Sequence, residues 1–148
     1  MSDPDLCLAD FFKADHRACD AAWTEVEEAV EEGDAATCKS AFERYDRIQR
    51  RHLRMEEEVM FPAFEKRSGM TQGPTQVMRM EHQQMRGVLE QMAQAVAGSD
   101  FQELLDQGDT LLMLIQQHNQ KEEGILYPMA DKVLAAEWNV LRERLAEL

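Results

Sequence analysis

The stretch HLRMEEEVMFP at residues 52–62 returns in altered form as HNQKEEGILYP at residues 118–128, an offset of 66 residues (118 − 52). Each copy begins with a histidine, carries a glutamate four residues later and ends on an aromatic residue followed by proline. Four residues turn an α-helix by about 400°, so the histidine and its glutamate lie on one face, one turn apart. The repeat therefore predicts two helices that each present a His–Glu pair on one face.

The rest of the chain also has the spacing of long helices. Glycine and proline are few, seven and four respectively, and four of the glycines fall at 31–34, 67–74 and 97–100. Between these breaks the apolar residues recur every three or four positions, which keeps them on one helix face, and nothing alternates with a period of two. Short connections between helices favour an antiparallel up-down-up-down bundle. We therefore predict an all-α fold, a four-helix bundle with a short fifth C-terminal helix, at about 4–32, 35–66, 72–97, 100–131 and 134–147.

Local signals indicate where some of these helices begin or bend. The pair Asp3–Pro4 is typical of an N-cap followed by proline in the first turn. Ser99, with Gln102 three residues later, resembles a capping box. Pro62 and Pro128 fall inside helical pattern, so we expect each to kink its helix or to start a new turn.

Length, charge and cysteine content restrict the class of protein. A chain of 148 residues suits one domain, residues 1–148. The formal net charge of −13 argues against a nucleic acid or an anionic membrane as partner, because both would be repelled. Cys7, Cys19 and Cys38 are odd in number and lack C-x-x-C spacing, which favours a reducing compartment. No apolar run could span a membrane and no secretory signal precedes the first helix, so we expect a cytoplasmic location.

Six polar residues interrupt the apolar faces of the four predicted long helices. With a rise of about 1.5 Å per residue, all of them fall at a similar height along the bundle axis. A single histidine on an apolar face is usually a hydrogen-bonded core residue, but unpaired carboxylates are strongly disfavoured in a core. Metal ions would supply the compensating charge. The predicted ligands are His16, His52, Glu56, His82, His118 and Glu122.

The kind and number of donors narrow the choice of metal. Imidazole and carboxylate together suit iron, manganese or zinc. Six protein ligands exceed what one tetrahedral zinc requires. They suit two metals, with Glu56 and Glu122 as bridges and the histidines divided between the two ions.

The order of these residues, with EEEVMFP and EEGILYP following the two pairs, resembles the hemerythrin-like (HHE cation-binding) domain family. The resemblance covers about residues 8–130. It implies two iron ions in a carboxylate-bridged non-heme di-iron centre, with an oxo or hydroxo bridge, that binds dioxygen or related small molecules.

The chain departs from the oxygen-carrying hemerythrins in two ways. Those proteins have a fifth histidine on the third helix, where this chain has Met78 and Arg86 four residues from His82. Their second bridging ligand is an aspartate five residues after its histidine, whereas Glu122 is four residues after His118. Water or a spare carboxylate could replace the missing ligand; the candidates are Glu57, Glu81, Glu123 and Asp20.

The predicted surroundings of the metals are narrow and apolar, and Tyr45 is a candidate hydrogen-bond donor to the ligands. The other predicted wall residues are Phe12, Cys19, Met85, Leu89, Leu114, Ile115 and Ile125. The leading hypothesis is a protein that binds dioxygen or nitric oxide for storage or sensing. The alternatives are a redox enzyme (peroxide breakdown, ferroxidase activity or nitric oxide reduction), an iron donor for iron–sulfur repair, and a metal-free bundle that forms a homodimer through its C-terminal helix.

Overall fold

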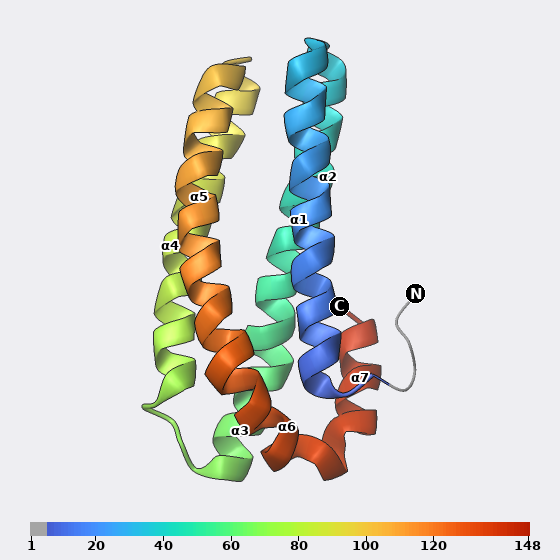
Figure 1. Ribbon diagram of the computed structural model, residues 1–148, viewed down its shortest axis with the longest axis vertical. Helices are drawn as coiled ribbons and strands as arrows, with labels where there is room; N and C mark the ends of the chain where they lie inside the picture. The colour runs from blue at the N-terminus through green and yellow to red at the C-terminus, as the bar shows by residue number, and fades with distance from the viewer. Residues whose placement is uncertain (1–5) are drawn as a thin grey trace.

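The computed structural model describes residues 6–148, so the expected cap at Asp3–Pro4 lies outside the described residues. These residues form helices joined by short connections and contain no strand, which confirms the all-α prediction (Figure 1). The long helices are α1 (Leu8–Glu32), α2 (Ala35–Met55), α4 (Pro74–Ala97) and α5 (Phe101–Lys121). The shorter ones are α3 (Phe61–Ser68), α6 (Tyr127–Leu134) and α7 (Trp138–Ala146).

The four long helices form two antiparallel pairs. Helix α1 packs against α2 and α4 packs against α5, and both hairpins turn at the same end of the bundle (Figure 1). Gly33 closes α1 in the left-handed region, with φ of 80°, which glycine adopts without steric cost. Helices α3, α6 and α7 close the opposite end, where Trp138 donates through Nε1 to the carbonyl of Leu6 at 2.9 Å. The up-down-up-down bundle expected from the short connections is therefore present.

Two π-helical turns interrupt the long helices at the repeated motif. They are η1 (Glu56–Met60), between α2 and α3, and η2 (Glu122–Leu126), between α5 and α6. In each turn the amide that follows donates to a carbonyl five residues earlier, Phe61 to Glu56 and Tyr127 to Glu122. The next residue is a proline, which has no N–H and is tolerated in the first turn of α3 or α6. π-turns of this kind occur frequently at functional sites.

The capping box predicted at Ser99 is wrong by one residue. Ser99 has φ of 55°, and Asp100 caps α5 by accepting from the amide of Glu103 through Oδ1 at 3.1 Å. The left-handed turn at Ser99 brings the carboxylate of Asp100 over the free amides at the start of the helix. Within residues 6–148 no helix is both long and apolar enough to cross a membrane.

The apolar core is divided into two clusters along the bundle axis. One lies at the end closed by α3, α6 and α7 and includes Phe12, Met55 and the buried face of α7, formed by Trp138, Leu141 and Leu145. The other lies between the long helices and includes Trp23, Tyr45 and Leu89. His16 comes between Phe12 and Trp23 along α1, and His52 comes between Tyr45 and Met55 along α2. The predicted metal ligands thus lie between two apolar layers.

Candidate metal centre

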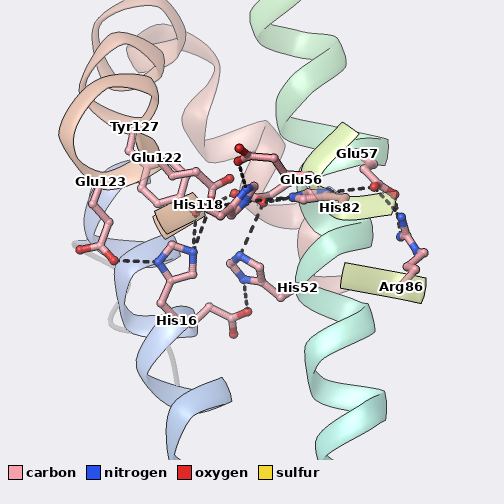
Figure 2. Close-up of polar contacts among 12 residues, drawn as sticks. His16, His52, Glu56, Glu57, His82, Arg86, His118, Glu122, Glu123 and Tyr127 are labelled. Carbon is pink, nitrogen blue, oxygen red and sulfur yellow. Dashed lines mark hydrogen bonds and ion pairs between the residues drawn. The ribbon is translucent and has the colours of Figure 1, made fainter. Parts of the chain in front are cut away.

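The six sequence-predicted ligands lie together, buried, in the middle of the bundle (Figure 2). Each histidine comes from a different long helix, and each glutamate is the first residue of a π-turn. We call these residues the His–Glu cluster: His16, His52, Glu56, His82, His118 and Glu122. They form two groups of four donors, each able to hold a metal ion, one with His16 and His52 and one with His82 and His118. Glu56 and Glu122 belong to both groups.

The separations between donor atoms match the spacing of neighbouring ligands on a metal ion. At metal–ligand distances of about 2.1 Å, neighbouring donors of an octahedral ion lie about 3.0 Å apart. His16 Nε2 and His118 Nε2 lie 3.0 and 3.1 Å from the same oxygen, Glu122 Oε1. His82 Nε2 lies 3.1 Å from Glu56 Oε1 and 3.2 Å from His118 Nε2. The Nε2 atom of His52 is farther out, 3.6 Å from Glu56 Oε1.

Every histidine of the cluster is hydrogen-bonded through Nδ1, the ring nitrogen farther from the cluster, to a carboxylate. The bonds from Nδ1 are 2.8 Å for His16, 2.7 Å for His52, 2.8 Å for His82 and 2.9 Å for His118. In the same order, the acceptors are Glu123, Asp15, Glu57 and Glu81. A carboxylate at Nδ1 fixes the ring orientation and the tautomer, and it leaves Nε2 with a lone pair directed inward.

Polar atoms without partners remain at the centre of the cluster. Among residues 6–148, the buried side-chain atoms that lack a hydrogen bond include His52 Nε2, Glu56 Oε1 and Glu122 Oε2. A buried polar atom without a partner is costly, and most such atoms in proteins are satisfied. The Nε2 atoms of His82 and His118 also face each other, 3.2 Å apart. A bound cation would satisfy all of these atoms, so the donor set fits a metal centre.

In the metal-free protein, protons on the histidines supply the positive charge that a metal ion would otherwise bring. Burial lowers the pKa of His16, but the hydrogen bond and charge of Glu122 outweigh it and raise the pKa to about 9. His82 is likewise raised to a pKa of about 9, against burial, by Glu56 and Glu57. Burial and the charge of Glu122 raise the pKa of Glu56. Although burial also raises the pKa of Glu122, its hydrogen bonds with Glu56, His118 and His16 hold that pKa well below its ordinary value.

These raised histidine pKa values predict opposite pH dependences for metal binding and for the stability of the metal-free protein. A metal must displace the protons of His16 and His82, so its affinity should rise by roughly tenfold per pH unit for each proton displaced, up to about pH 9. The protonated histidines stabilise the metal-free fold fully below pH 6.5, and this contribution is lost as pH rises through about 9.

Two titrations measure these dependences. Competition between the protein and a chelator for Zn²⁺ gives the affinity at each pH, and thermal unfolding of chelator-treated protein gives the stability. An affinity that stays constant from pH 7 to 9 would contradict the raised pKa values.

Tyr127 contacts the cluster and is a residue that the sequence analysis missed. Its hydroxyl donates to Glu56 Oε2 at 2.6 Å and lies 3.0 Å from both Glu122 Oε1 and His16 Nε2. Its pKa is raised well above its ordinary value by burial and by the charges of Glu122 and Glu56. The signal was in the repeat, because Tyr127 aligns with Phe61 at the end of the two copies.

Some residues that the sequence predicted near the metal site make other contacts or lie elsewhere in the structure. Tyr45 donates to Gln49 Oε1 at 3.2 Å rather than to a residue of the cluster. Ile125 was expected in the pocket wall, but its side chain is 58% exposed because the π-turn directs it outward. At the positions of the missing histidine, Met78 packs in the apolar core and Arg86 donates to both oxygens of Glu57 at 2.7 Å.

The spare carboxylates fall into two kinds. Three of the four candidates to replace the missing ligand, Glu57, Glu81 and Glu123, accept hydrogen bonds from histidine Nδ1 atoms. The fourth, Asp20, lines an open groove between α1 and α5 that also reaches Glu123.

Comparison with known families agrees with this geometry. The chain matches the model of the hemerythrin HHE cation binding domain over residues 7–130. Searches of curated proteins and of solved structures returned no match. The matched range includes all six residues of the His–Glu cluster and Tyr127. The chain belongs to the hemerythrin HHE cation-binding domain family.

Proposed function

We propose that this chain is a non-heme di-iron protein that binds dioxygen or nitric oxide for storage or sensing. The observation that carries the proposal is the division of the His–Glu cluster into two groups of donors that share both glutamates. Two ions in these groups would be bridged by Glu56 and Glu122, and each would keep two histidines of its own. Two buried bridging carboxylates and four neutral imidazoles suit a pair of divalent or trivalent cations.

The surroundings of the cluster favour a small ligand. Apolar layers lie on both sides of it along the bundle, and its own side chains are buried. The open groove between α1 and α5 reaches Glu123, which accepts from His16, so solutes come within one side chain of the cluster. Diatomic molecules and peroxide have the size for such a site. A cytoplasmic location is part of the proposal, supported by the free thiols of Cys7, Cys19 and Cys38.

Elemental analysis combined with optical spectroscopy tests this function. Protein purified without chelators is expected to contain two irons per chain. After reduction, exposure to air should produce a charge-transfer spectrum that disappears under argon and returns with air. The same reduced protein should give a different spectrum with nitric oxide. A spectrum of the oxygenated form that survives thorough removal of oxygen would exclude reversible binding, and protein without iron would exclude the di-iron centre.

Peroxide breakdown is the second candidate, and the number of donors favours it. Each group of the cluster supplies four protein donors, which leaves positions open on an octahedral ion. Open positions would allow turnover of peroxide rather than storage of dioxygen. The test is the rate of peroxide loss with iron-loaded protein against the same concentration of free iron, with the Glu122→Gln variant as control. A rate no higher than that of free iron would exclude this enzyme activity.

A further inference from the structure

The two halves of the centre are related by the 66-residue offset of the sequence repeat. The offset relates the cluster residues of one half to those of the other, and it also relates the carboxylates behind the histidines. The first residue of each pair belongs to the first half: His16 and His82, His52 and His118, Glu56 and Glu122, Asp15 and Glu81, Glu57 and Glu123. Each pair has the same role in the structure, so the centre has an approximate two-fold symmetry.

The symmetry is broken at the aromatic residue that follows each π-turn. The ring of Tyr127 lies 5.5 Å from that of His16, with 31° between the planes. The ring of Phe61 lies 5.5 Å from that of His82, with 30° between the planes. The two rings thus occupy equivalent places in the two halves. They differ in chemistry, because the tyrosine alone has an oxygen to offer.

The side chain of Tyr127 reaches into the His–Glu cluster, where its hydroxyl contacts several donor atoms (Figure 2). It is 3.0 Å from His16 Nε2, 2.6 Å from Glu56 Oε2 and 3.0 Å from Glu122 Oε1. Of these neighbours, the two glutamates belong to both groups, whereas His16 belongs only to the group that also contains His52. These separations are close to the spacing of about 3.0 Å between adjacent donors of an octahedral ion. The oxygen therefore lies at about the spacing of a neighbouring ligand from three donor atoms, and His16 assigns it to the metal held by His16 and His52.

We infer that Tyr127 is a phenolate ligand of the metal held by His16 and His52, which leaves the metal held by His82 and His118 with one protein donor fewer. The inference rests on the proposed di-iron centre and deepens it. Ligation forms one bond between the metal and the phenolate oxygen and releases the phenolic proton, as for other ligands that bind deprotonated. Tyrosine is an established donor to ferric iron. The small ligand then binds at the second metal, beside Phe61.

The chain has two tyrosines, so the test has a matched control. Wild-type protein loaded with ferric iron is expected to show a visible charge-transfer band from phenolate to iron, with tyrosinate vibrations in its resonance Raman spectrum. The Tyr127→Phe variant should lose both signals and keep iron. The Tyr45→Phe variant should keep both signals, because Tyr45 hydrogen-bonds to Gln49 instead of the cluster. Signals that persist in Tyr127→Phe would overturn the inference.

The Phe61→Tyr variant adds a hydroxyl at the equivalent position of the other half, and it tests whether a second phenolate ligand can be gained there. Phe61→Tyr should give a band with about twice the wild-type intensity, because two phenolates would then contribute. It should also bind azide more weakly than the wild type, because the added phenolate occupies the open position of the second metal. The Phe61→Tyr variant tests phenolate ligation even if Tyr127→Phe fails to hold both irons. Unchanged intensity and unchanged azide affinity in Phe61→Tyr would count against the inference.

The results separate this inference from the proposed function. Wild-type protein that binds two ferric ions without tyrosinate signals would refute phenolate ligation and leave the di-iron centre standing. Wild-type protein that binds no iron would refute both. Far-ultraviolet circular dichroism of each variant, compared with the wild type, shows that the helices are retained.

Discussion

Replacement of Glu122 by glutamine is expected to reduce the iron content from two ions per chain to one or none. Glu122 is fully buried and belongs to both groups of donors. The same oxygen lies 3.0 Å from His16 Nε2 and 3.1 Å from His118 Nε2. Glutamine keeps the shape but removes the negative charge that both cations would share, and a neutral amide is a poorer ligand than a carboxylate. Elemental analysis after loading with excess ferrous iron measures the effect.

The neighbouring residue provides the control. Glu123→Gln makes the same chemical change one position along the chain, in a side chain that accepts from His16 Nδ1 and is 30% exposed. Loss of such a supporting carboxylate typically costs about 10–100-fold in metal affinity without removing a ligand. Glu123→Gln should therefore still hold two irons at saturation. If Glu122→Gln also held two at the same affinity as the wild type, Glu122 would not be a bridging ligand.

A second large effect is expected at Gly108, in the middle of α5. A Cβ atom at this position would lie 2.2 and 2.6 Å from two carbons of the Trp23 ring. Trp23 is buried, and its ring packs 5.2 Å from that of Tyr45, so it cannot move aside without disturbing the core. Overpacking of this kind costs about 1–3 kcal/mol and sometimes more. We expect Gly108→Ala to lower the free energy of unfolding by at least about 2 kcal/mol in urea denaturation.

Helix propensity alone predicts that Gly108→Ala raises the free energy of unfolding. A comparison with another helical glycine therefore separates the effect of propensity from that of overpacking. Alanine in a helix interior is more stable than glycine by about 1 kcal/mol. Gly87 lies inside α4, and a Cβ atom added there would meet nothing within 4 Å, so Gly87→Ala should raise the stability by about that amount. Equal gains at both positions would show that Trp23 and Gly108 are not in close contact.

The fold was predictable because its signals are periodic and extend over many residues. Apolar residues at steps of three and four gave the long helices, and short connections gave their antiparallel order. The His–Glu cluster could be assembled from the sequence for the same reason. The repeat gave matching heights to residues on different helices, and Glu56 and Glu122 were conspicuous as carboxylates at core positions.

The details that could not be predicted depend on contacts between helices or on a local change of geometry. An apolar pattern does not distinguish a π-turn from an α-helical turn, so the outward direction of Ile125 was missed. The carboxylates that accept hydrogen bonds from the histidines are partly exposed, and acidic residues are common throughout this chain. Their partners are fixed by helix packing, as with Glu57 on η1 and His82 on α4. In the sequence Tyr127 resembles an ordinary core aromatic, and only its distances to the His–Glu cluster distinguish it.

The two π-turns have a consequence for how this chain tolerates insertions and deletions. Each turn accommodates one residue more than an α-helix with the same hydrogen-bonded ends, and Phe61 or Tyr127 follows directly after it. Loss of that residue would rotate everything downstream by about 100° and carry the aromatic ring away from its histidine. We therefore expect the chain to tolerate insertions and deletions in the loop at residues 69–73. The number of residues between each glutamate and its aromatic residue has to stay the same.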